Sequence, residues 1–438
     1  MVARRDFIKL AAGATAASPF ILCSGARAAG KALRIAKWAH FVPEFDVWFE
    51  SVARDWGARR HIKVTVDTVP VEKVAALAAA QTRAGKGHDI CIFPWPPAEY
   101  HQHAIDHGAV YRLVANKYGA IQQLAHRSTF NLHTHQYFAF ADFYMPTPIQ
   151  FRQDSWEKVG MPVGPMTWSS LRVGGRDLRA KFGLPLGLAF TPTLEGNVTL
   201  HTLLYSHRAW LLDANGDTLF NKNVFGLVAL RFIESLYRES GAPEQLGWGS
   251  AGNVRAMLAG KASVSSNAIN LVRAAEKQDP QLAGKIWLQP PLLGTNGMGV
   301  TALPHVTNCS VVWNFGRNQD AATQFLADLV DSSRTGYEKS LGCNFPIYPK
   351  TVPDLIVRLA KDPRAEPSFK YTALKDALHW TPNLGVPGFA TPAYMEVFNS
   401  FLIPRMVQSV LQGERSPEDA AARAAAEIQS IVTKWQQV

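Results

Sequence analysis

A regular alternation of strand and helix patterns at the start of the folded region is the feature that most constrains this chain. Residues 33–38, 62–67 and 89–93 have the apolar or alternating character of strands. Between them, apolar residues at three- and four-residue spacing predict helices over residues 45–56 and 71–78. Strand, helix, strand, helix, strand in this order predicts a βαβαβ unit with parallel strands.

The ends of the first and third predicted strands are where a ligand site is expected, because parallel α/β sheets bind ligands beyond the carboxyl ends of their strands. These ends carry the segments 38–41 (WAHF) and 94–97 (PWPP). Two prolines within residues 143–149 then end the unit. Further α/β elements are predicted over residues 184–188, 198–211, 286–288, 298–312 and 322–329, and a last helix begins at Ser416-Pro417.

Length and composition exclude several other kinds of protein. The chain has 438 residues, of which 47% are hydrophobic and 18% charged, with 12 tryptophans. A disordered chain would be poorer in apolar and aromatic residues. The length suggests two or three domains, each large enough for a core. After the N-terminal segment there is no apolar run of about 18 residues, which a membrane-spanning helix would need.

The N-terminal segment has the pattern of an export signal. Arg4 and Arg5 precede the mildly apolar stretch 10–22, and small residues follow up to Ala28. The paired arginines are typical of twin-arginine export. We therefore expect residues 1–28 to be a signal peptide, cleaved near Ala28, and the mature protein to be periplasmic. Its formal charge is then +7 rather than +10, because the signal carries four basic residues and one acidic residue.

The cysteines and histidines do not predict a metal or cofactor. Cys91, Cys309 and Cys343 would remain after export, an odd number that allows one disulfide but builds no disulfide framework. Cys91 lies in an apolar strand and is interpreted as a core residue.

Two clusters of histidines leave zinc binding as an alternative. His101, His103 and His107 lie in a predicted helix, where residues i and i+2 face apart, and His133 and His135 follow later. Zinc needs three or four converging ligands. Solvated polar histidines are the simpler interpretation, and no cofactor or metal is predicted.

An exported hydrolase is the main rival interpretation. Ser155 and Lys158 fit the pattern S-x-x-K, but the other motifs of that enzyme class do not follow as expected. The sequence contains no G-x-S-x-G, H-E-x-x-H or P-loop motif. The densest basic stretch, residues 59–63, is short and carries no nucleic-acid recognition motif. Catalysis and nucleic-acid binding are therefore not predicted.

Several segments resemble the extracellular solute-binding proteins of ABC importers, in particular the sugar-binding, maltose-binding-like branch. They keep the order and spacing of that family over most of the mature chain. The similar segments are residues 144–154 (YMPTPIQFRQD), 157–162 (EKVGMP), 167–168 (TW), 256–262 (AMLAGKA), 313–318 (WNFGRN) and 413–420 (GERSPEDA).

The resemblance implies an α/β fold of type II-like periplasmic binding proteins. Two lobes, each a mainly parallel sheet flanked by helices, would be joined by crossing strands that act as a hinge. After the signal peptide, lobe 1 would comprise residues 29–146 and 301–345. Lobe 2 would comprise residues 147–300, and residues 346–438 would form a C-terminal helical part that packs mainly on lobe 2 and the hinge.

The same resemblance implies a periplasmic binding protein, a monomer that delivers a small polar solute to an ABC permease in the inner membrane. A carbohydrate is expected, since sugars pack on aromatic rings and hydrogen-bond to polar side chains. A polyol, polyamine, peptide or metal chelate is the alternative. Core packing, helix capping and packed turns are the competing roles for the candidate ligand-binding residues, which are Trp38, His40, Phe41, Trp95, Tyr144, Asn197, Trp248, Asn267, Trp380 and Asn383.

Overall fold

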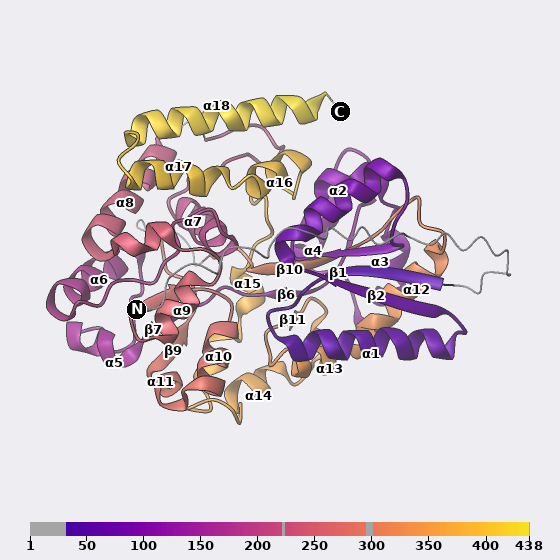
Figure 1. Ribbon diagram of the computed structural model, residues 1–438, viewed down its shortest axis with the longest axis horizontal. Coiled ribbons are helices and arrows are strands. Elements are labelled where there is room, and N and C mark those ends of the chain that lie inside the picture. Colours follow the sequence, from indigo (N-terminus) through magenta and orange to yellow (C-terminus); the bar gives the residue numbers. More distant parts are fainter. Residues whose placement is uncertain (1–31, 221–223, 295–300, 438) are drawn as a thin grey trace, which may run out of the picture.

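Two α/β lobes lie side by side in the computed structural model, which describes residues 32–220, 224–294 and 301–437 (Figure 1). The expected signal peptide lies outside these residues, as does the beginning of the strand region expected from residue 298. None of the described helices is long and apolar enough to cross a membrane.

Lobe 1 is built on a six-stranded sheet in the order β11-β6-β10-β3-β1-β2. The predicted parallel pairing is confirmed, since β1 pairs in parallel with both β2 and β3. β10 and β11 run opposite to the other four strands. The strands are β1 (Ala32–Trp38), β2 (Lys63–Val69), β3 (Ile90–Phe93), β6 (Phe140–Met145), β10 (Val306–Val312) and β11 (Phe345–Pro346).

The first helices of lobe 1 form where the apolar spacing predicts them. Helix α1 (Pro43–Arg59) starts with a proline, carries acidic residues in its first turn and buries Phe45, Phe49 and Trp56. Helix α2 (Val74–Ala84) ends at Gly85, whose φ of 59° is left-handed and suits glycine. The remaining elements are α3 (Gly108–Tyr118), α4 (Gln123–Thr129), the hairpin β4 (Phe130–Asn131) and β5 (Gln136–Tyr137), α12 (Gln319–Leu329) and α13 (Ser333–Lys339).

Lobe 2 corrects one part of the expected architecture. Its sheet has the order β8-β7-β9, and both pairings are antiparallel, so it is not a mainly parallel sheet. The central strand β7 (Ile149–Arg152) enters directly from lobe 1, whereas β8 (Val264–Ser266) and β9 (Ile286–Gln289) run back beside it. The helices are α5 (Gln153–Trp156), α6 (Trp168–Phe182), α7 (Leu194–Ser206), α8 (Phe225–Ser240), α9 (Gly252–Leu258), α10 (Asn270–Gln278) and α11 (Pro280–Lys285).

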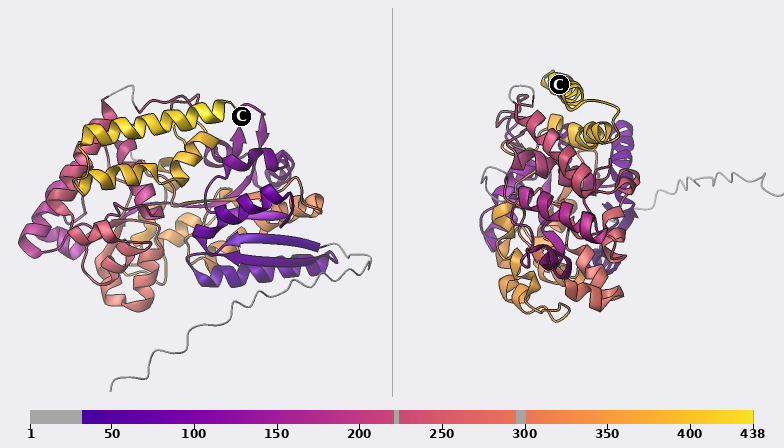
Figure 2. Two further views of the ribbon diagram at one scale, coloured as in Figure 1. Left: turned by 45° about the horizontal axis from the view of Figure 1, so that its top comes forward. Right: turned by 90° about the vertical axis from the view of Figure 1, so that its left-hand side faces the viewer.

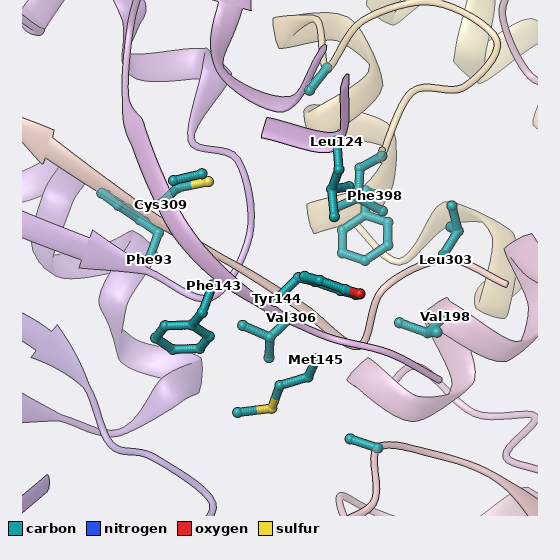
Figure 3. Packing of buried hydrophobic residues seen from close by; sticks show 14 of the residues in the cluster. Phe93, Leu124, Phe143, Tyr144, Met145, Val198, Leu303, Val306, Cys309 and Phe398 are labelled. Atoms are coloured by element: carbon teal, nitrogen blue, oxygen red, sulfur yellow. The ribbon is translucent and has the colours of Figure 1, made fainter. Parts of the chain in front are cut away.

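Two strands of lobe 1 lead across the lobe junction. β6 continues through residues 146–148 into β7, and residues 301–305 lead back into β10. The Thr147 hydroxyl donates to the Leu303 carbonyl at 2.8 Å, which ties the two crossing segments together. The apolar side chains around them form one continuous buried cluster with both lobes (Figure 3).

The C-terminal part packs on both lobes. Its elements are α14 (Leu355–Ala360), α15 (Ala377–Trp380), α16 (Pro392–Asn399), α17 (Leu402–Leu411) and α18 (Pro417–Gln436). Helix α17 packs on α7 and α8 of lobe 2, and α18 lies over α16 and α17 (Figures 1 and 2). Helix α16 packs against the 3-10 helix η2 (Ala98–His103) of lobe 1. The limits of the lobes at residues 146, 300 and 345 stay predictions.

Candidate functional site

The N-terminus of α7 holds Asn197 and lies next to Trp248, two of the predicted site residues. The Thr193 side chain caps this helix by accepting from the Gly196 amide at 3.1 Å. Asn197 therefore lies inside the first turn, and the alternative that Asn197 is the helix cap is wrong. Its side-chain amide donates to the Phe398 carbonyl of α16 at 2.7 Å, and only 1% of Asn197 is exposed.

Glu195 and His305 bring ionisable groups from α7 and a crossing segment into one region. Glu195 accepts from the Ala251 amide at 3.1 Å through Oε1, and its Oε2 is buried without a hydrogen-bond partner. His305 lies just before β10. Burial lowers the pKa of His305, and the nearby charge of Glu195 opposes this shift. The His305 imidazole and the Glu195 carboxyl group therefore lie near each other at the lobe junction.

Aromatic side chains from lobe 1 lie beside these polar groups. Phe41, which is half-buried, has its ring centroid 5.5 Å from that of His305 and 5.5 Å from that of Trp38. Trp95 lies at the end of β3, and its ring centroid is 6.0 Å from that of Phe398 in α16. Both segments at the carboxyl ends of β1 and β3 thus reach residues outside the sheet of lobe 1.

On the side of lobe 2, Trp248 and Asn267 are held by short polar contacts. The Trp248 carbonyl accepts from the Thr191 hydroxyl at 2.7 Å, next to the start of α7. The Asn267 amide donates to Asn253 Oδ1 at 3.3 Å, and the Asn267 carbonyl accepts from the Gln150 amide at 2.8 Å. Hydrogen bonds therefore hold the backbone carbonyls of Trp248 and Asn267, while several side-chain atoms near the junction have no hydrogen-bond partner.

Several buried side-chain atoms on the elements that meet at this junction have no hydrogen-bond partner. Most buried polar atoms in proteins have a partner, so a local group without partners calls for a ligand or ordered water. The group takes members from α7, β7, the segment after β8 and the crossing segment. Its buried, unpartnered atoms are Glu195 Oε2, Asn197 Oδ1, His201 Nε2, His305 Nδ1, Gln150 Oε1 and Asn267 Oδ1.

His40 and Asn383 make structural contacts away from these atoms. His40 Nε2 pairs with Asn344 Oδ1 at 2.9 Å inside lobe 1, and burial lowers the pKa of His40 to about 3. The side-chain amide of Asn383 donates to the carbonyls of Leu384 and Gly388 at 2.8 and 2.9 Å. That is the packed turn considered as the alternative for Asn383.

Tyr144 and Trp380 lie at the crossing segments and are buried. The Tyr144 ring is 5.8 Å from that of Phe345, and its hydroxyl points to the side where Phe398 and Leu303 lie (Figure 3). The Trp380 carbonyl accepts from the Ala302 amide at 3.2 Å, and its Nε1 is buried without a partner. Both residues brace the crossing segments in this structure.

A separate cavity inside lobe 1 is too small for a sugar. It holds about 30 Å³ and lies under α1 and α13. Most of its lining is aromatic or aliphatic, and Lys37, Asp142, Asn308 and Asn344 contribute polar groups. The side wall includes Trp38, whose indole donates to Asn308 Oδ1 at 2.8 Å. A space of this size accommodates one or two water molecules.

The histidine clusters and cysteines do not assemble a metal site in the part of the chain that the structure describes. No group of three or more His, Cys, Asp or Glu side chains there could hold a metal ion. Cys91, Cys309 and Cys343 are buried and free, so the possible disulfide does not form.

The residues of the S-x-x-K pattern have other partners. The Ser155 hydroxyl donates to Asp154 at 3.4 Å, and the Lys158 ammonium lies 5.6 Å from the ring centre of Phe182. Ser155 lies in α5, as a helix start would place it. These contacts give the hydrolase interpretation no support.

Sequence reasoning overlooked four side chains of this junction: Gln150, Glu195, His305 and Phe398. Gln150 lies inside the segment 144–154, and Glu195 lies two residues before the candidate Asn197, so their polar character next to a strand and a helix start was a usable signal. His305 and Phe398 carry no such signal, because their importance comes from neighbours that are more than a hundred residues away in sequence.

Known protein structures share this architecture. The chain matches an ABC-transporter solute-binding protein from Thermotoga lettingae TMO, solved with α-D-tagatose (19% identity, 92% of this chain and 100% of that chain, TM-score 0.75). It matches a sugar transporter from Arthrobacter chlorophenolicus A6 with bound laminaribiose (14% identity, 91% of this chain and 99% of that chain, TM-score 0.76). It also matches maltose-bound MalE3 of T. maritima (17% identity, 91% of this chain and 99% of that chain, TM-score 0.74). No protein-family model and no curated protein sequence matches the chain.

These matches cover nearly the whole of both chains, so they establish the fold. Because the sequence identity is below 20%, they establish the fold alone. The chain has the two-lobe fold of ABC-transporter solute-binding proteins. The expected fold class is thereby confirmed, except that the sheets are not mainly parallel: three of the five strand pairings in lobe 1 and both pairings in lobe 2 are antiparallel.

Proposed function

We propose that this protein is the exported solute-binding component of an ABC importer and that it holds a carbohydrate between its two lobes without changing it chemically. The observation that carries the proposal is the group of buried, unpartnered polar atoms at the lobe junction, with Phe41 and Trp95 nearby. Sugar hydroxyls can serve both donors and acceptors, and their C–H faces pack on aromatic rings. The sugars bound by proteins of the same fold support this choice.

The individual groups suggest how a sugar would be held. Glu195 Oε2 accepts from a hydroxyl, and so do the side-chain oxygens of Asn197 and Asn267. His305 Nδ1 either donates or accepts, according to its tautomer. We further propose that residues 1–28 direct export, that the mature chain works in the periplasm, and that a permease at the inner membrane receives the solute.

A thermal-shift screen of the mature protein tests the proposal. Mono- and disaccharides are compared with polyols, amino acids and polyamines. A solute that binds only the folded state adds about 2.7 kcal/mol to the free energy of unfolding at about 100 times its Kd. We expect at least one sugar to raise the Tm.

Two results would contradict the proposal in different ways. A Tm shift with an amine or peptide, and with none of the sugars or polyols, would show that the carbohydrate assignment is wrong. Turnover of a glycosidic or ester substrate by the purified protein would show that it is an enzyme rather than a binding protein.

A further inference from the structure

One polar contact joins lobe 1 to the C-terminal helices through two side chains that are 300 positions apart. The side-chain amide of Asn399, at the end of α16, donates to Glu99 Oε1 in η2 at 2.9 Å. A carboxylic acid and a primary amide can form two hydrogen bonds with each other, one in each direction. As a carboxylate, Glu99 can only accept, and then only one of these bonds is possible.

The atoms that would make the second bond are both buried and both lack a partner. They are Glu99 Oε2 and Asn399 Oδ1, the remaining oxygens of the same two groups. Two acceptors cannot satisfy each other, and a buried acceptor without a partner destabilises the folded state. A proton on Glu99 Oε2 removes the problem, because the O–H then donates to Asn399 Oδ1.

The surroundings favour that proton. Burial raises the pKa of Glu99 to about 7; the Glu99 backbone amide and the hydrogen bond from Asn399 oppose the shift, and the charge of Glu396 adds to it. Glu396 lies on α16 and is itself paired with Lys434 of α18 at 2.7 Å, so this lysine does not compensate Glu99.

Further titratable groups lie on the elements around the pair, among them Tyr100 and His101 on η2 and His201 on α7. Tyr100 and His101 are neighbours of Glu99 on η2, and burial raises the pKa of Tyr100 and lowers that of His101. On α7, His201 contacts the Phe398 ring at 5.4 Å, and burial lowers its pKa to about 4, which leaves it neutral near pH 7.

The pair lies next to two predicted ligand-binding residues. Phe398, the residue before Asn399, accepts from the Asn197 amide at 2.7 Å, and its ring packs against Trp95 of lobe 1. Trp95 precedes η2 in sequence. Phe398 thus links both residues to α16, and we expect a shift of η2 on α16 to move Trp95 relative to Asn197.

We propose that protonated Glu99 and Asn399 form a cyclic acid–amide pair that holds η2 against α16, so that both act as positioning residues for Trp95 and Asn197. The consequence for ligand affinity rests on the proposed function, whereas the pair itself does not. The proton comes from solvent and stays on Glu99 Oε2. The pair is complete at acidic pH and loses one of its two hydrogen bonds as the pH rises through about 7.

Glu99→Gln provides a matched variant. A glutamine amide donates to Asn399 Oδ1 through Nε2 and accepts from Asn399 Nδ2 through Oε1, so it makes the same two bonds and does not titrate. Asn399→Leu removes the partner. Amide hydrogen exchange of residues 98–103 and 396–400 is measured in the mature protein at about pH 5.5 and about pH 8.5, after correction for intrinsic exchange rates.

In the wild type we expect the protection of these amides to be at least about threefold lower at the higher pH. Protection should be the same at both pH values in Glu99→Gln, and low at both in Asn399→Leu. Equal protection at both pH values in the wild type would overturn the proposal. So would a pH dependence in Glu99→Gln that matches the wild type.

A second measurement separates this proposal from the proposed function. The Kd of the sugar identified in the screen is measured at the same two pH values, and it should change in the wild type but not in Glu99→Gln. If no sugar binds while the exchange results are as expected, the pair stands and the carbohydrate proposal fails. If a sugar binds but its Kd responds to pH equally in both proteins, Glu99 does not position the site.

Discussion

The βαβαβ unit of lobe 1 and the lobe junction differ in the sequence distance over which their contacts form. In the unit, neighbouring strands pair in register, as in Ile35 with Val66 and Ile35 with Ile90. At the junction, Asn197 bonds to Phe398 and Glu99 bonds to Asn399. Local apolar periodicity is enough to build the first region, whereas the second exists only after distant segments have met. Mutations should therefore affect stability in the first region and ligand binding in the second.

The largest expected effect is a loss of stability in the unit. Phe49 of α1 is 3% exposed and packs against Phe325 of α12 at 6.2 Å. We expect Phe49→Ala to lower the free energy of unfolding by about 3–5 kcal/mol, because it leaves a cavity in the core. Urea unfolding measures this. Val47→Ala on the same helix is the control, because Val47 is 71% exposed and its loss should cost little.

At the junction, the expected effect is on affinity instead. Glu195→Gln keeps an oxygen for the Ala251 amide but loses the charge at the unpartnered atom. We expect the Kd for the sugar to rise by an amount that corresponds to about 1.5–3 kcal/mol, with little change in unfolding. Titration calorimetry measures the Kd, and the exposed Glu157→Gln serves as the control. A large loss of stability without a loss of affinity would place Glu195 among the structural residues.

The protonation of two buried histidines, one in lobe 1 after the βαβαβ unit and one in α7, compares lobe 1 with the junction. Burial lowers the pKa of His107 in lobe 1 and of His201 in α7 to about 4. Because these values lie below the ordinary value of about 6.5, the stability from each neutral imidazole is present above about pH 6.5. It is lost as the pH falls towards 4, by at most about 1.4 kcal/mol per pH unit.

Imidazole NMR signals follow each histidine separately, which matters because the raised pKa values of Asp142 and Glu99 act in the opposite direction on total stability. Both histidines should stay neutral at about pH 5.5 in the folded protein and titrate normally in urea. Since His201 Nε2 has no partner in this structure, sugar binding should shift its signal more than that of His107, whose Nε2 accepts from the Val312 amide at 2.9 Å.

The smallest expected effect concerns a feature that lies outside both regions. The Ser416 side chain caps α18 by accepting from the Asp419 amide at 3.1 Å. Ser416→Ala should cost about 1 kcal/mol of unfolding free energy and leave the Kd unchanged. Ser430→Ala, at an exposed position of the same helix, should be neutral or slightly stabilising. A change in Kd from Ser416→Ala would mean that the C-terminal helices influence the site beyond α16.

Much of the fold was predictable from particular residues. The apolar spacing around Phe45, Phe49 and Trp56 marks α1, and Ser416 with Pro417 marks the start of α18. The antiparallel sheet of lobe 2 was not predictable in the same way. Its strands are short, and strand direction depends on which segments pair, which a local pattern does not record.

The features of the candidate site also fall into those that follow from local sequence and those that depend on contacts between distant segments. By itself, the sequence determined where β1 and β3 end, because the end of a strand is a local feature, and it predicts Phe41 and Trp95 as ligand-facing residues beyond those ends. Only the tertiary structure decided that His40 faces Asn344, that Glu195 lies near His305 and that Glu99 meets Asn399. The physical reason is that a polar group acquires its partner, its burial and its pKa from whatever the folded chain brings next to it.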